Sequence, residues 1–248
     1  MLKSASTPVS TADRVLQVLA VLAQHGQALS ATELMERTGL ARSTLYRQLT
    51  RLKSWGFVLE SEGHYAPGPL SLQLALGFDM ASHLVRLARP DMVALAQQSH
   101  ESVGLIVAVN DQAICLDMVE SQQSLRCSFE TGRSVPLRDG ASAKCVLAHL
   151  PEAARAAVLD AHYGPASPER QAAKDELDAI CQAGFATSAG EVDPGVWGAS
   201  VPLFGASRQA VGAITLMAPI LRAQGQEQTL IRMAVVAAAR ISRHLTLP

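Results

Sequence analysis

One stretch constrains the fold of this chain more than any other: residues 30–58, SATELMERTGLARSTLYRQLTRLKSWGFV. Ser30 and Glu33 have the spacing of a capping box, in which the hydroxyl and the carboxylate each satisfy a free amide at a helix start. The helix that begins there is expected to end at Thr38, and Gly39 supplies the sharp turn into another helix. One inward-facing apolar stripe is predicted along that next helix, formed by Leu45, Leu49 and Leu52.

The outward face of this helix is rich in hydrogen-bond donors. From Gly39 to Ser54 there are four basic residues and no acidic one, a local charge of +4, whereas the rest of the chain sums to −5. Major-groove recognition needs an exposed helix, donors that reach guanine or phosphate, and small polar neighbours. Basic faces of short helices are often merely solvated, so the prediction of DNA binding depends on the whole order of helices, turn and hairpin. The predicted DNA-binding residues are Arg42, Ser43, Thr44, Tyr46, Arg47 and Arg51, with Thr50 on the same face.

The segments on either side complete a winged helix-turn-helix. Residues 11–25 carry an apolar stripe that follows a Ser/Thr cap and precedes a glycine, which predicts a first helix. After the basic helix, Phe57 and Leu59 alternate with polar residues, and a turn at residues 62–63 leads into a return strand. The acidic Glu60 argues against strong phosphate binding by this two-stranded wing.

Residues 69–89 are expected to form a linker helix that is apolar on nearly all sides. Its leucines alternate as in a strand, but the segment is too long and too rich in Ala and Leu for a typical strand. Pro90 is expected to break the helix before another one at about 91–100. A helix of this kind must be covered, and a second copy of the chain would cover it.

The remaining residues predict an α+β domain built on an antiparallel sheet. Residues 102–121 favour a hairpin with its turn at 110–111, and Leu125, Cys127 and Phe129 alternate as in a further strand. Another strand then leads into a helix at about residue 140. Helices are expected at about 152–162, 168–183 and 225–245, and strands near 184–188, 197–203 and 210–217.

Composition and cysteine spacing exclude several classes. A net charge of −1 with 48% hydrophobic residues is unlike a disordered or uniformly cationic chain. Cys115, Cys127, Cys145 and Cys181 form no C-x-x-C pair and have no histidine at ligand spacing, so no metal or cofactor is expected. We interpret them as buried thiols in a reducing cytoplasm. The sequence has no apolar signal core and no apolar run of about 18 residues, so neither secretion nor a membrane span is expected.

Two segments of the second domain could hold a ligand. Residues 140–144, GASAK, open a helix with small side chains and leave its first amides unpaired, which attracts carboxylates. Residues 188–204, SAGEVDPGVWGASVPLF, form a turn-rich loop that enters a strand of small residues. Both segments could equally be sites of tight packing.

In this order and spacing, the segments resemble the IclR family of transcriptional regulators over about residues 10–245. RVLQVLAVLA, ATELMERTGLARSTLYRQLTRLKSWGFV, GRSVPLRDGASAKCVLA, GEVDPGV and VGAITLMAPILR carry the similarity. The resemblance implies a winged helix-turn-helix DNA-binding domain over 1–68, a linker helix over 69–89 and a GAF-like α/β effector-binding domain with an antiparallel sheet over 90–248. It also implies a homodimer or a dimer of dimers, a homotetramer, on double-stranded operator DNA. By position, the implied effector-binding residues are Cys127, Ala141, Ser142, Ser188, Gly198, Thr215 and Met217.

The sequence departs from the family where the ligand would lie. Members that bind small keto acids favour a polar pair at the positions of Thr215 and Met217, so this pocket should prefer a larger or more apolar ligand. The expected effector is an aromatic or medium-chain organic acid. Two alternatives stay open. One is an enzyme with Cys145 or Cys127 as nucleophile, although neither thiol has a histidine base next to it in the sequence. The other is a dimeric DNA-binding protein that senses no ligand.

Overall fold

The computed structural model of the chain describes residues 10–246, apart from the side chains of residues 79–81. The chain divides into two compact units, one up to Ser82 and one from His83 onward. Each unit has a buried core of its own. The predicted domain boundaries at 68/69 and 89/90 stay predictions.

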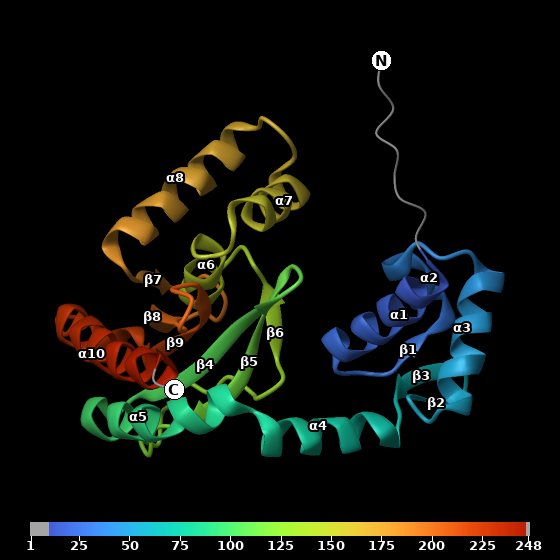
Figure 1. The fold of residues 1–248 in the computed structure, drawn as a ribbon, viewed down its shortest axis with the longest axis horizontal. Coiled ribbons are helices and arrows are strands. Elements are labelled where there is room, and N and C mark those ends of the chain that lie inside the picture. Colours follow the sequence, from blue (N-terminus) through green and yellow to red (C-terminus); the bar gives the residue numbers. More distant parts are fainter. Residues whose placement is uncertain (1–9, 247–248) are drawn as a thin grey trace. The chain divides into compact units, whose positions relative to one another are not determined.

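The first unit is a helix-turn-helix followed by a wing (Figure 1). Capping fixes where its helices begin: the Ser30 amide donates to Glu33 Oε2 at 2.8 Å, and the Glu33 amide donates to Ser30 Oγ at 3.3 Å. Gly39 then takes a left-handed conformation, with φ of 65°, which glycine adopts without steric cost. The capping box and the glycine turn are therefore confirmed. The elements of this region are α1 (Thr11–His25), β1 (Leu29–Ser30), α2 (Ala31–Thr38), α3 (Arg42–Ser54), β2 (Val58–Ser61) and β3 (His64–Pro67).

The predicted hairpin of the wing is confirmed, because β2 pairs with β3 across the turn at residues 62–63, but a third strand joins it and the predicted alternation is wrong. The sheet has the order β1-β3-β2, because the two residues of β1 pair with the outer edge of β3. The inward side chain of β2 is Val58, which is 2% exposed, whereas Leu59 is 54% exposed. The strand begins at Val58, so the alternation is shifted by one residue, and such a shift exchanges the two faces of a strand.

The linker helix ends earlier than predicted. The segment forms α4 (Pro69–Ala81) and α5 (His83–Ser99), and the backbone between them is extended at Ser82. Pro90, the predicted break, lies inside α5 on its exposed side. A proline at this position removes the amide that would bond to the carbonyl of Arg86, and the helix continues despite that loss.

The second unit is built on one antiparallel sheet with the order β6-β5-β4-β9-β8-β7. The hairpin predicted over 102–121 is confirmed, as are the strand leading into a helix near residue 140 and the later strands and helices. The elements are β4 (Ser102–Val109), β5 (Gln112–Val119), β6 (Ser134–Pro136), α6 (Ala141–Ala148), α7 (Glu152–Tyr163), α8 (Pro168–Ala183), β7 (Ala186–Ala189), β8 (Val196–Phe204), β9 (Ala210–Pro219), α9 (Ile220–Ala223) and α10 (Glu227–Thr246).

Helices cover both faces of this sheet (Figure 1). α5 and α10 pack on one face, and α6, α7 and α8 lie over the other. The neighbouring residues Leu105 and Ile106 of β4 belong to opposite cores, as the alternation of a strand requires. The ends of β7, β8 and β9 meet the start of α6 on the second face, and this meeting point forms the cavity described below.

The strand predicted around Leu125, Cys127 and Phe129 is absent, and residues 124–130 are irregular. Several polar groups of this segment bond to side chains from other parts of the chain. Arg222 donates to the carbonyl of Leu125 at 2.7 Å, and the Ser128 hydroxyl donates to Glu120 at 2.6 Å. Within the described part of the chain, no helix combines the length and apolar character needed to span a bilayer.

Candidate DNA-binding helix and ligand cavities

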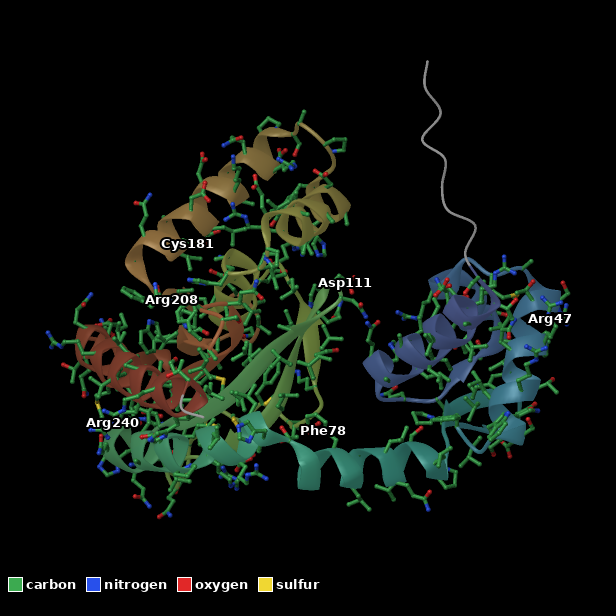
Figure 2. All side chains as sticks on the ribbon, viewed as in Figure 1. Arg47, Phe78, Asp111, Cys181, Arg208 and Arg240 are labelled. Carbon is green, nitrogen blue, oxygen red and sulfur yellow. The ribbon has the colours of Figure 1, made fainter. Side chains whose placement is uncertain are left out.

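Helix α3 exposes the face that the sequence predicts. Leu45, Leu49 and Leu52 are at most 3% exposed and belong to the core of the first unit. On the other side, Arg42, Ser43, Tyr46, Arg47, Thr50 and Arg51 are exposed, and Thr44 is half-buried. Figure 2 shows Arg47 on the side of α3 that faces away from its own unit. The Arg42 guanidinium lies 5.7 Å from the centre of the Tyr46 ring, which favours a common orientation of the two side chains.

The positive charge of α3 is unevenly available. Lys53 pairs with Glu60 of β2, so the wing neutralises that end of the helix. Across the described residues, no ion pair involves Arg42, Arg47 or Arg51. Three guanidinium groups therefore remain free to meet an anionic partner such as a phosphate backbone.

A small cavity lies at the start of α6, where β7, β8 and β9 reach the helix. The strand register aligns Ser188 with Gly198, and Gly198 with Met217, so these residues form one row across three strands. The cavity encloses about 50 Å³, which is room for a few water molecules. Six of the seven predicted effector-binding residues line it: Ala141, Ser142, Ser188, Gly198, Thr215 and Met217.

The first amides of α6 are already occupied by the protein. The Ala141 amide donates to Ser188 Oγ at 2.9 Å, and the Gly140 amide donates to Glu191 Oε2 at 2.9 Å. Lys144 pairs with the same Glu191 carboxylate at 2.9 Å. The sequence predicts a ligand segment in the loop around residue 191 but assigns no role to Glu191, because its partners lie about fifty residues earlier in the chain.

Cys127 lies elsewhere, in a second cavity beside the irregular segment at 124–130. We call this the outer cavity, and the one at α6 the inner cavity. The outer cavity has a volume of about 470 Å³, within the range of small-molecule sites. The two cavities share four lining residues: Phe129, Asp193, Val196 and Met217. The structure thus separates Cys127 from the other six predicted residues by a common wall.

Cys127 and Cys145, the two candidate nucleophiles, lack the lowered pKa of a reactive thiol. Cys115, Cys127 and Cys145 are buried, but Cys181 on α8 is exposed, so the prediction that all four are buried is wrong for that residue (Figure 2). Burial raises the pKa of Cys145 to about 12 and also raises the pKa of Cys127. A reactive thiol needs a lowered pKa. Among the described side chains, no group of His, Cys, Asp and Glu could hold a metal ion.

The cysteines should differ in their reaction with iodoacetamide. At about pH 8, we expect rapid alkylation of Cys181 in the native protein, while Cys115 and Cys145 stay unmodified because burial raises the pKa of both thiols to about 12. Mass spectrometry of peptides over time would measure this order, and the same protein unfolded in guanidinium is the control. Faster modification of Cys127 or Cys145 than of Cys181 would instead support a thiol-dependent activity.

Comparisons with known proteins agree with this architecture. Residues 11–61 match the model of the IclR helix-turn-helix domain, and residues 80–243 match the model of the C-terminal domain of the bacterial transcriptional regulator IclR. The HTH-type transcriptional regulator Rv1719 of Mycobacterium tuberculosis is 32% identical over 223 residues, which cover 88% of this chain and 85% of that protein. The transcriptional repressor IclR of Escherichia coli is 26% identical over 247 residues, which cover 95% and 89%.

A solved structure has the same fold throughout. The crystal structure of an IclR family transcriptional regulator from Brucella abortus superimposes on this chain with a TM-score of 0.83 and 20% sequence identity. The match covers 98% of this chain and 95% of that chain. The two family models together span most of the described residues, and the N-terminal helix-turn-helix and the C-terminal α+β domain occur in the order that they require. The chain therefore belongs to the IclR family of transcriptional regulators.

Proposed function

We propose that this protein is a ligand-responsive, DNA-binding transcriptional regulator in which α3 enters the major groove of operator DNA. The exposed basic face of α3 is the observation that carries this proposal. It presents Arg42, Arg47 and Arg51 without an acidic neighbour on the helix, while the opposite face is fixed in the core. Ser43, Thr44 and Tyr46 complete the proposed reading face. A role on chromosomal DNA implies a cytoplasmic protein, and this proposal gives it no catalytic activity.

Pairing of two chains would give the helices their geometric selectivity. On α4, Leu72, Leu74, Leu76 and Phe78 are each 46% to 64% exposed, an apolar surface that a second copy would cover. In a dimer, or in each half of a dimer of dimers, two copies of α3 would read half-sites about 34 Å apart. A small change in the placement of the two reading helices would then remove the affinity supplied by one half-site.

The proposed effector is a small organic acid with an aromatic or medium-chain body, bound where β7, β8 and β9 meet α6. Support comes from the inner cavity, where Ser142 and Ser188 provide hydroxyl groups and Met217 provides a flexible apolar wall. The Thr215 hydroxyl donates to Ser200 Oγ at 2.9 Å, so that polar group is already satisfied. The inner cavity must widen to admit such a molecule, because its present volume suits only a few waters.

Selection of a duplex and its titration would test the proposal. A duplex enriched by the full-length protein from random sequence would be labelled, and its Kd measured by fluorescence anisotropy with and without benzoate, phenylacetate, hexanoate or octanoate. We expect at least one acid to change the Kd by about fivefold or more, a typical coupling between sites. Acetate and pyruvate are the size controls. If none of the acids raises the melting temperature of the protein, the alternative of a dimeric DNA-binding protein that senses no ligand is favoured. If only acetate or pyruvate changes the Kd, the proposed size of the effector is contradicted.

A further inference from the structure

The outer cavity has the features of a binding site for an amphipathic ligand. Its apolar lining residues include Leu125, Ile220 and Leu221, of which Leu125 and Leu221 are 68% and 86% exposed. Its charged lining residues are Arg126, Arg133 and Asp193. An apolar surface with a few charged groups is the arrangement expected for a molecule that has a charged end and an apolar body.

Arg133 is held loosely enough to accept a different anion. Its guanidinium lies 4.5 Å from the centre of the Phe129 ring, which orients the side chain along the cavity wall. Its contact with Asp193 is 3.4 Å long, and both side chains are about two-fifths exposed. Charge-assisted bonds between arginine and carboxylate are usually about 2.7–2.9 Å long. Most of the five guanidinium donors therefore remain available.

Other groups near the two cavities are poorer anchors for a carboxylate. The inner cavity is lined by Glu191 and Asp193, and among its described lining residues there is no Lys, Arg or His. Glu191 also occupies the Gly140 amide, which would otherwise attract an anion. In the outer cavity, Arg126 is the second arginine, and its Nε bonds to Glu120 at 2.8 Å. Arg133 is the remaining cation of the outer cavity.

We propose that the carboxylate of the effector, an organic monocarboxylate with an aromatic or aliphatic body, lies in the outer cavity, where Arg133 holds it in place of Asp193, while the body extends toward the inner cavity. This inference rests on the proposed function, since it assigns the acidic group of the effector to one side chain. The apolar body lies against Phe129 and Met217, the wall that both cavities share.

The same exchange connects the ligand to α6. Asp193 lies in the loop at 190–195. Glu191 of the same loop accepts a hydrogen bond from the Gly140 amide and pairs with Lys144. When the ligand replaces Asp193 on Arg133, the loop loses one of its ties to the segment before β6. Val192 of the loop packs over Gly140, so movement of the loop would widen the inner cavity.

Calorimetric titration of the full-length protein tests the role of Arg133. The probes are phenylacetate and octanoate, with phenylacetamide and octanamide as uncharged analogues of the same shape. We expect the acids to bind the wild type, and Arg133→Gln to weaken them about tenfold or more while leaving the amides unchanged. Arg138→Gln is the matched control and should leave binding of the acids unchanged, because Arg138 pairs with Asp139 and lines neither cavity. Equal binding of the acids to wild type and Arg133→Gln would overturn the assignment.

Asp193→Asn provides a test in the opposite direction. Removing the internal competitor should tighten binding of both acids several-fold, whereas a purely structural role of Asp193 predicts weaker binding. If the amides bind as tightly as the acids, Arg133 is not the anchor, although the protein can still be a ligand-responsive regulator. If no acid or amide binds the wild type, both this inference and the proposed organic-acid effector fail, while DNA binding by α3 is unaffected.

Discussion

Replacing Arg222 by alanine is expected to lower the free energy of unfolding of the second unit by about 3 kcal/mol, the effect of leaving a buried charge without its partner. Glu101 is 4% exposed, and Arg222 contacts both of its carboxylate oxygens at 2.6 and 2.7 Å. Hydrogen bonds to Glu101 raise the pKa of Arg222, which favours the charged guanidinium. The substitution also removes the donor to the Leu125 carbonyl.

The two tryptophans allow this effect to be measured in one unit. Trp197 is buried in β8, and Trp55 lies in the first unit. In a Trp55→Phe background, urea unfolding followed by fluorescence reports on the second unit alone. Arg126→Ala is the control, because Arg126 and Glu120 are both 45% exposed and such a pair contributes about 0–1 kcal/mol. If Arg222→Ala and Arg126→Ala shift the urea midpoint equally, the buried ion pair does not stabilise the sheet.

Replacing Arg47 by alanine should weaken DNA binding by about tenfold or more, and should lower the slope of log K against log salt by about 1 if the side chain contacts a phosphate. Arg47 is exposed, and no ion pair with a described residue competes for it. The measurement is anisotropy on the enriched duplex over a range of salt concentrations. A loss that depends on one base pair of the duplex would indicate a base contact instead.

Lys53 provides the matched control on the same helix. Its ammonium group pairs with Glu60, so Lys53→Ala should change DNA affinity less than Arg47→Ala does. Both variants remove one positive charge from α3, which separates the effect of position from the effect of net charge. Unchanged affinity and an unchanged salt slope for Arg47→Ala would exclude this face of α3 as the reading surface.

Local signals were sufficient to predict the helix-turn-helix of the first unit. Ser30, Glu33 and Gly39 act within a few residues of themselves, so the sequence shows both the helix start and the turn. The basic face of α3 follows in the same way, because a helix period assigns each residue to the core or to solvent. The role of this face in DNA binding is a separate question that the mutants above address.

Features that depend on distant partners could not be predicted in this way. Pro90 is a helix breaker by local rules, yet it lies on the exposed side of α5 and the helix continues. The alternation at 125–129 resembles a strand, but Arg222 binds its backbone from about a hundred residues later in the chain. Glu191 accepts a hydrogen bond from the Gly140 amide, which lies 51 residues earlier in the chain. For residues 125–129 and for Glu191 the deciding contact is tertiary, and a single sequence does not display it.

The position of β4 has a consequence for synthesis on the ribosome. β4 pairs with β9, which is made about a hundred residues later, so the middle of the sheet stays open until translation is almost complete. The first unit has all of its core partners much earlier, and early domains fold while later ones are still being made. A prematurely terminated product that ends before β9 would retain α3 without a closed sheet. Under the proposed function, such a fragment would keep the reading helix but lack the part of the chain that responds to a ligand.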